Sequence, residues 1–321
     1  MLPASPIVGN ASQPGVVLTW YGAGTHGGAT LGDQFAVENL SARLTARGIQ
    51  HSVLSAYPIS VRARVIRDHR QVPEIGVLVH VCGPLLPTPF LMDLAKRAKV
   101  RIAVGVSVLD RFEPFNDEFD AIVVRDGQQP ETFDLAPARF ADAATPPVSR
   151  SPPAPAIGLC LRGNQKEYGG AAIFHDKADD LFASTIARSG GASHTIDTLL
   201  RSDNVAAGIV AAFQRADVIA TTRMHGAILG LSYGKPVIAI DQVAGGAKVA
   251  SLLGRVGWPL VFRGDSVTQD DIDDAFAKAT SPEIGEIVAR CRAEVIRLSM
   301  SAVETSVRTI AAMASMTAGS A

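Results

Sequence analysis

The feature that most constrains the fold is an alternation of short apolar segments with helical patterns along most of the chain. Short apolar runs bounded by glycine, proline or polar residues indicate buried strands, whereas apolar residues recurring at helical spacing indicate helices. The expected strands are residues 16–21, 52–54, 75–81, 100–106, 120–124, 157–161, 193–196, 217–221 and 236–241. The expected helices are residues 35–47, 90–99, 177–189, 205–215, 224–233 and 283 to about 314. Apolar strands that alternate with helices predict parallel sheets covered on both faces.

A segment rich in proline, alanine and serine, residues 141–155, interrupts this alternation. It contains few large apolar side chains, so it cannot contribute to a core and is typical of a linker between domains. The α/β pattern resumes after it, and we therefore expect two Rossmann-like domains, residues 1–145 and 146–321, with parallel sheets facing a cleft. The helical pattern that begins at residue 283 is longer than one such domain needs, so we expect it to return toward the first domain.

The charge balance and the cysteines exclude several classes of protein. Thirty basic and thirty-one acidic side chains give a net charge of -1, whereas nucleic-acid binders normally carry a net basic charge. The three cysteines lie far apart and form no C-x-x-C pair, which indicates neither a zinc site nor a disulfide framework. No acidic cluster with metal-ligand spacing occurs either, so we expect no metal. From the charge balance we expect no nucleic-acid partner.

Nothing in the sequence predicts a membrane span. The N-terminal segment lacks the basic and apolar regions of a signal peptide. The most apolar long stretch, residues 218–240, contains Arg223, His225 and Lys235, which a span would have to bury. We therefore expect a cytoplasmic protein that associates at most peripherally with the inner face of the cell membrane. Residues 60–70 are basic and helical in period, and form either a solvated helix or a surface for anionic lipid.

The strongest functional pattern lies in residues 216–241, where strand, helix and strand follow one another. The first strand ends at Thr221 and Thr222, either of which can N-cap the helix. Arg223 and His225 then fall in the first turn, at the carboxyl edge of a parallel sheet, where ligands of such sheets bind. Free backbone N–H groups and an arginine fork favour an anion at this position, and a histidine can move a proton near neutral pH.

This pattern and several others carry a family resemblance. Residues 223–226 read Arg-Met-His-Gly, follow the sequence ADVIATT and precede a helix that ends in GKPVIAID. The other matches are TLGD at residues 30–33, VHVCGPLL at 79–86, VRD at 124–126, IGLCLR at 157–162, and Lys248 after the last strand. Over roughly residues 16 to 260 the chain resembles the polysaccharide pyruvyl transferase family. Thr30 replaces the family's usual asparagine, and Cys82-Gly83-Pro84 replaces its run of glycines.

The resemblance implies an enzyme and its substrates. The family moves the pyruvyl group of phosphoenolpyruvate onto two hydroxyls of a sugar, which forms a cyclic ketal and releases phosphate. The chain would then be a GT-B-like transferase of polysaccharide biosynthesis that needs no cofactor. Its donor would be phosphoenolpyruvate, bound on the second domain, and its acceptor a saccharide, free or lipid-linked, bound on the first.

The resemblance also suggests roles for individual side chains. We expect His225 to be the general acid, or else a proton-bearing ligand of the leaving phosphate. Asp33 is either a base for an acceptor hydroxyl or a carboxylate that satisfies the start of the first helix. The expected substrate-binding positions are Arg223, Lys248, Gly226, Thr222, Arg162, Arg125 and Gly32. Arg125 and Arg162 are each open to a second interpretation, a structural ion pair.

Other interpretations stay open from the residues alone. A nucleotide-sugar glycosyltransferase of GT-B type often carries Glu-x7-Glu, and Glu286 and Glu294 have that spacing within one helical pattern. A non-catalytic protein that binds anions or sugars on the same scaffold is a further possibility. Residues 22–32 contain G-x-G-x-x-G, but no acidic residue follows the second strand, which disfavours a dinucleotide site. His80 lies in an apolar strand, where we expect a hydrogen-bonded core residue.

Overall fold

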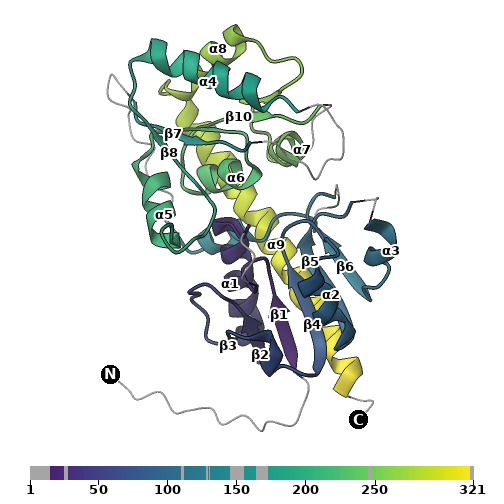
Figure 1. The fold of residues 1–321 in the computed structure, drawn as a ribbon. Coiled ribbons are helices and arrows are strands. Elements are labelled where there is room, and N and C mark those ends of the chain that lie inside the picture. The colour runs from purple at the N-terminus through teal and green to yellow at the C-terminus, as the bar shows by residue number, and fades with distance from the viewer. Residues whose placement is uncertain are drawn as a thin grey trace.

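The structure is a computed structural model, which describes residues 15–24, 28–109, 112–127, 129, 131–144, 155–163, 173–244 and 248–318. It consists of two α/β lobes, each built on a parallel sheet (Figure 1). The first lobe carries strands β1 to β6 and the second carries β7 to β11. The predicted fold class, two Rossmann-like units with parallel sheets, is confirmed. Most of the expected linker, residues 145–154, lies outside the described residues.

The sheet of the first lobe has the strand order β3-β2-β1-β4-β5-β6. Its strands are β1 (Val16–Thr19), β2 (His51–Leu54), β3 (Arg64–Ile66), β4 (Ile75–Val81), β5 (Ala98–Val106) and β6 (Ala121–Val124). Its helices are α1 (Leu31–Ala46), α2 (Pro89–Lys96) and α3 (Glu113–Asn116), with 3₁₀ helices at His69–Gln71 and Ala136–Phe140. Strand order reverses between β1 and β4, which makes their carboxyl ends the expected ligand crevice of this sheet.

The sheet of the second lobe has the order β11-β10-β9-β7-β8. Its strands are β7 (Ile157–Cys160), β8 (Ser193–Thr195), β9 (Val218–Thr221), β10 (Val237–Asp241) and β11 (Val261–Arg263). Its helices are α4 (His175–Ser189), α5 (Ala206–Arg215), α6 (Met224–Ser232), α7 (Lys248–Arg255) and α8 (Gln269–Ala279). Here strand order reverses between β7 and β9, so the crevice of this sheet lies at the segments that carry Arg162 and Arg223.

The expected long C-terminal helix is present as α9 (Ile284–Ala318). Its buried apolar side chains include Val288, Val295, Val303, Val307 and Ile310. Both lobes cover these side chains, because α9 packs against β4, β5 and α1 of the first lobe and against α6 of the second. The backbone N–H of Ala138 donates to Ser299 Oγ on α9, at 2.8 Å. Figure 1 shows α9 in yellow, running from the second lobe along the first.

Residues 60–70 do not form the expected helix. Residues 64–66 form strand β3, which pairs in parallel with β2, and a 3₁₀ turn follows. The segment alternates basic and apolar residues, a pattern that also has the period of a strand, and the β-branched Val65 and Ile66 favour the extended form. The prediction of a basic helix over residues 60–70, either solvated or facing anionic lipid, is therefore wrong. Among the residues that the structure describes, no helix has the length and apolar character to cross a bilayer.

Candidate functional site

Helix α6 presents His225 at the edge of its sheet, but its cap differs from the expectation. The N-cap is Arg223, not a threonine, and its side chain makes no capping hydrogen bond. Thr221 lies two residues before this cap: its Oγ1 accepts from the backbone N–H of Arg223 at 2.9 Å and donates to the carbonyl of Cys160 at 2.7 Å. His225 is consequently the second residue of the helix, and its side chain points out of the second lobe.

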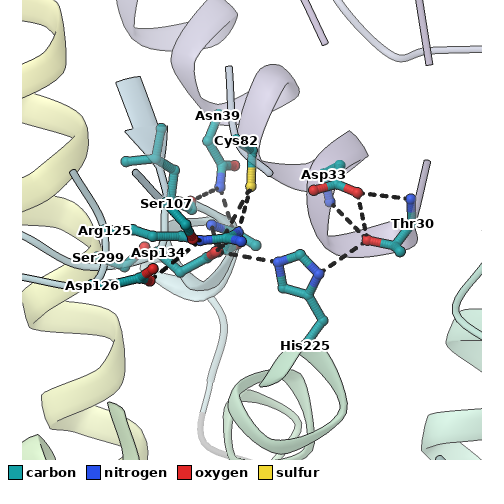
Figure 2. A network of polar contacts seen from close by, with 12 residues as sticks. Thr30, Asp33, Asn39, Cys82, Ser107, Arg125, Asp126, Asp134, His225 and Ser299 are labelled. Carbon is teal, nitrogen blue, oxygen red and sulfur yellow. Dashed lines mark hydrogen bonds and ion pairs between the residues drawn. The ribbon is translucent and has the colours of Figure 1, made fainter. Parts of the chain in front are cut away.

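The His225 ring bridges the two lobes. Its Nδ1 lies 3.0 Å from Thr30 Oγ1, at the start of α1. Its Nε2 lies 3.2 Å from Asp134 Oδ2, in the loop after β6. Only 8% of His225 is exposed, so both contacts are made away from bulk water. Figure 2 shows the ring reaching from α6 between these two residues.

The partners of His225 are able to accept a proton from each ring nitrogen. When Thr30 Oγ1 donates its single proton to Asp33 Oδ2, at 2.8 Å, it accepts from Nδ1. The Asp134 carboxylate likewise accepts from Nε2. The network is therefore satisfied when the ring is an imidazolium, which is the form that a general acid needs.

Asp33 has the capping role that was one of its two expected interpretations. Helix α1 begins at Leu31, and Thr30 and Asp33 form a capping box. Asp33 Oδ2 accepts from the backbone N–H of Thr30 at 2.9 Å as well as from its hydroxyl. Asp33 is 5% exposed and thus closes the network on the side of Thr30.

Two expected substrate-binding glycines prove to be positions of close packing. A Cβ at Gly32 would overlap the His225 ring. A Cβ at Gly226 would overlap Thr221 Oγ1 and lie 2.7 Å from Cys160 Sγ. Gly32 therefore permits the lobes to approach at His225, and Gly226 permits α6 to start against the ends of β7 and β9.

Asp134 is the residue of this network that the sequence interpretation missed. It is fully buried, and its Oδ1 accepts from the backbone N–H of Ala136 at 2.9 Å. Burial would raise its pKa, but His225 and Arg125 outweigh this effect and hold the pKa at about 2. Asp134 follows the Val124-Arg125-Asp126 segment by eight positions, and no motif distinguishes it from other loop aspartates.

Arg125 lies behind Asp134 and is occupied by protein groups. Its Nη1 is 3.2 Å from Asp134 Oδ2 and 3.3 Å from Cys82 Sγ, and its Nε donates to Ser107 Oγ at 3.0 Å. Burial opposes the charge of Arg125, but Cys82, Asp126 and Asp134 raise its pKa above the usual value. These contacts favour the second interpretation of Arg125, a structural ion pair.

Asp33, Cys82 and His225 bring three potential metal ligands within 4.8 Å of one another. The set does not suit a cation, since the Arg125 guanidinium already contacts Cys82 Sγ. Burial, first of all, raises the pKa of the Cys82 thiol well above its usual value, so the thiolate that binds metals is disfavoured. Cys82 has φ of 63°, a conformation that only the surrounding contacts can hold.

The second lobe places positive charge beside the start of α6. Arg223 Nε donates to the carbonyl of Leu161 at 2.7 Å. Burial lowers the pKa of Arg223, and Arg162 adds to this effect, which Cys160 and Asp197 oppose without reversing it. Thr222 Oγ1 accepts from the backbone N–H of Arg162 at 2.8 Å and thus holds the loop after β7 against α6. Lys248 opens α7, after the neighbouring strand β10.

The backbone also joins the lobes next to this charge. Leu31 N–H donates to the carbonyl of Thr198, and Leu200 N–H donates to that of Ala29, both at 2.8 Å. Thr198 Oγ1 in turn lies 3.4 Å from Arg223 Nη1. The cationic edge of the second lobe and the Thr30–Asp33 turn of the first lobe thus meet at one seam.

The comparisons with known proteins agree with the resemblance. The model of the polysaccharide pyruvyl transferase family matches residues 140–242, the part of the chain that holds Arg162, Arg223, His225 and Gly226. No curated protein matches the chain.

Several solved glycosyltransferase structures resemble the whole chain. The glycotransferase of kitacinnamycin is 15% identical, with 94% of this chain and 99% of that chain covered and a TM-score of 0.47. The calicheamicin glycosyltransferase is 14% identical, with 94% and 98% covered and a TM-score of 0.46. The spinosyn rhamnosyltransferase, solved with thymidine diphosphate, is 11% identical, with 92% and 98% covered and a TM-score of 0.41.

Proposed function

We propose that this protein is a pyruvyl transferase that moves the pyruvyl group of phosphoenolpyruvate onto two hydroxyls of a polysaccharide or its precursor. The observation that carries the proposal is the Arg223-x-His225-Gly226 segment. It lies within the part of the chain that the family model matches, and its histidine, with ring nitrogens 3.0 Å from Thr30 Oγ1 and 3.2 Å from Asp134 Oδ2, stands beside the largely buried Arg223.

The donor carries a phosphate and a carboxylate, and the second lobe supplies groups suited to both. Arg223, Arg162 and Lys248 bring three positive charges to the carboxyl edge of the sheet. The first backbone N–H groups of α6 have no partner within the helix and favour an anion. Thr222 and Gly226 shape this edge by holding the loop after β7 and the start of α6.

His225 delivers the proton that starts the reaction. Its Nε2 faces the fully buried Asp134, whereas its Nδ1 faces the half-buried Thr30, so the donor approaches from the Nδ1 side. Proton transfer to the methylene carbon of phosphoenolpyruvate makes a methyl group and leaves positive character on the adjacent carbon. Asp134 holds the ring in place and stabilises its charge before the transfer.

The two acceptor hydroxyls complete the ketal. The first hydroxyl attacks the positive carbon and loses its proton to Asp33, phosphate then leaves, and the second hydroxyl closes the ring. Of the two hydroxyl protons, one replaces the proton that His225 gave and the other leaves with phosphate. A carboxylate oxygen of Asp33 lies within 4.8 Å of a ring nitrogen of His225, and this proximity supports the role.

The two lobes divide the substrates between them in this proposal. We set the boundary between residues 145 and 146, with the acceptor on the N-terminal side and the donor on the C-terminal side. Phosphoenolpyruvate is a cytoplasmic metabolite, so the reaction takes place in the cytoplasm, on a free or a lipid-linked saccharide of exopolysaccharide or envelope synthesis. A lipid-linked acceptor would bring the protein to the inner face of the cell membrane without a spanning segment.

One experiment separates this function from its alternatives. The protein is mixed with phosphoenolpyruvate and a panel of oligosaccharides, and phosphate release and the ketal methyl signal are followed by NMR. Acceptor-dependent release together with a ketal methyl signal supports the proposal. Transfer from a nucleotide sugar alone would indicate a glycosyltransferase, and donor binding without turnover would indicate an anion-binding protein.

The Glu286/Glu294 pair does not favour the glycosyltransferase, because both residues lie on α9 and Glu294 forms an ion pair with Arg297 at 2.7 Å.

A further inference from the structure

A cavity of about 340 Å³ opens at the crevice of the first sheet. It is lined by residues that follow β1, by His80 on β4 and by the start of α2. Thr19 and His80 are register partners on β1 and β4, the strands between which strand order reverses. This is where open parallel sheets bind ligands, and the size suits a small molecule. None of the functions assigned above uses this cavity.

The lining combines aromatic rings with polar atoms that lack partners. Trp20, Tyr21 and Phe90 contribute ring surface. Trp20 Nε1 and both ring nitrogens of His80 are buried and find no hydrogen-bond partner in the described part of the chain. His80 was expected to be a hydrogen-bonded core residue, and this expectation is wrong. Buried polar atoms normally have partners, so these atoms mark a place where a ligand supplies them.

The lining also defines the charge of the ligand. No acidic side chain, lysine or arginine is among the described residues that line the cavity. Burial lowers the pKa of His80 to about 4, with Asp33 opposing this effect, so the ring is neutral at pH 7. A phosphate or carboxylate would lose its hydration here without a countercharge, and an alkyl chain would leave the indole and imidazole nitrogens unpaired.

We propose that this cavity binds an uncharged sugar ring, which packs on the partly exposed ring of Phe90 and forms hydrogen bonds from its hydroxyls to Trp20 Nε1 and His80. A pyranose has an apolar face that packs on aromatic rings and hydroxyls at its edge that can both donate and accept. That this ring belongs to the pyruvylation acceptor rests on the proposed function. The charge of the Asp33 carboxylate raises the pKa of His80, and Asp33 also lies within 4.8 Å of His225. The cavity is therefore close to the residues of the proposed chemistry.

The chain contains two tryptophans, which provide a direct test with a built-in control. Trp258 is buried in the second lobe, and its Nε1 donates to the carbonyl of Val237 at 2.8 Å. The two indole N–H signals of the ¹⁵N-labelled wild-type protein are assigned with Trp20→Phe or, if that variant does not fold, with Trp258→Phe. The methyl glycosides of glucose, galactose and mannose are then titrated, alongside glucose 1-phosphate and phosphoenolpyruvate.

We expect at least one methyl glycoside to move the Trp20 indole signal saturably while the Trp258 signal stays in place. Phe90→Ala should weaken that binding about tenfold, because it removes a stacking face. Met92→Ala is the matched control, since Met92 is exposed on the same helix and does not line the cavity. If Phe90→Ala does not fold, Gly24→Val replaces it: a Cβ at Gly24 would lie 3.7 Å from the Phe90 ring and would fill the cavity without a backbone clash.

Three results would overturn the proposal: no movement of the Trp20 signal with any of the three glycosides, equal movement with the charged ligands, or unchanged affinity in Phe90→Ala. The readout needs no turnover, so it is independent of the proposed function. Glycoside binding without any ketal formation would refute the pyruvyl transferase and leave the sugar site in place. Ketal formation with an unchanged acceptor KM in Phe90→Ala would support the pyruvyl transferase and refute the sugar site in this cavity.

Discussion

His225 Nε2 lies 3.2 Å from Asp134 Oδ2, although the two residues are 91 positions apart and belong to different lobes. This ion pair is buried, and Arg125 supports it from behind. Breaking such a pair leaves an uncompensated charge, so it acts on stability and on the protonation of His225 together. The first two predictions separate these effects.

Replacing His225 by glutamine should remove the proton donor while keeping a polar side chain between the lobes. We expect phosphate release to fall by about 10² to 10⁴, the usual contribution of a general acid, with a much smaller change in phosphoenolpyruvate affinity. Turnover is followed by phosphate release and binding by calorimetry. His194→Gln is the control, because His194 Nε2 bonds to the carbonyl of Ala212 within the second lobe. Near-normal turnover in His225→Gln would exclude His225 as the acid.

Asp134→Asn should change how stability depends on pH. The folded pKa of Asp134 is about 2, below the ordinary aspartate value of 3.8, so its ionised form stabilises the fold by about 2 kcal/mol above pH 3.8. This contribution is lost as the pH falls through 2. The unfolding free-energy difference between wild type and variant should therefore be larger at neutral pH than in acid, as measured by urea titration. The exposed Asp117→Asn should show almost no difference, and a pH-independent difference for Asp134→Asn would refute the ionised pair.

Arg223→Lys should weaken phosphoenolpyruvate binding about tenfold, because an ammonium cannot reproduce the planar fork of a guanidinium. Isothermal calorimetry measures the affinity. Arg188→Lys serves as the control, since Arg188 is exposed and bonds to Asp273 away from the seam. Equal affinities of wild type and Arg223→Lys would remove Arg223 from the donor site.

Gly32→Ala should push His225 out of position, since the added Cβ overlaps its ring. We expect a loss of about 1 to 3 kcal/mol in unfolding free energy and a fall in turnover. Gly208→Ala is the matched control, because it lies in α5 with open space around its Cβ and should be neutral or slightly stabilising. A fully active and stable Gly32→Ala protein would show that the lobes do not need this close approach.

The neutral state of His80 predicts a loss of stability in mild acid. Its folded pKa of about 4 is below the ordinary histidine value of 6.5, because burial disfavours the charged ring. Its contribution is fully present above pH 6.5 and lost as the pH falls through 4, which amounts to about 3 kcal/mol. Unfolding measured at pH 7 and pH 4.5 should show a smaller loss for His80→Phe than for the wild type. An NMR titration that places the His80 midpoint near 6.5 would contradict the neutral, buried ring.

The sheet edge of the second lobe could be predicted from local pattern alone. Residues 216–241 read as strand, helix and strand, and β9, α6 and β10 follow that pattern closely. Because the carboxyl ends of parallel strands share one edge, the position of Arg223 and His225 followed without knowledge of distant contacts. The predicted N-cap of α6 was wrong by one or two residues, since Arg223 takes the position expected for Thr221 or Thr222.

Elements whose pattern fits two structures could not be predicted as well. Residues 60–70 have both a helical and a strand period, and the free edge of β2 decided in favour of a strand. The expected helix at residues 35–47 begins four residues earlier in the structure, because the capping box of Thr30 and Asp33 defines its start.

The sequence by itself determined what depends on neighbours along the chain: the α/β alternation, the two sheets, the long helix α9 and the cationic edge that holds Arg223. Only the tertiary structure decided what depends on how the lobes dock. Asp134 became a partner of His225, Gly32 a close-packing position and His80 a lining residue of a cavity only through contacts across tens of residues. Local periodicity carries no information on such distances, because they follow from the packing of whole sheets and helices against one another.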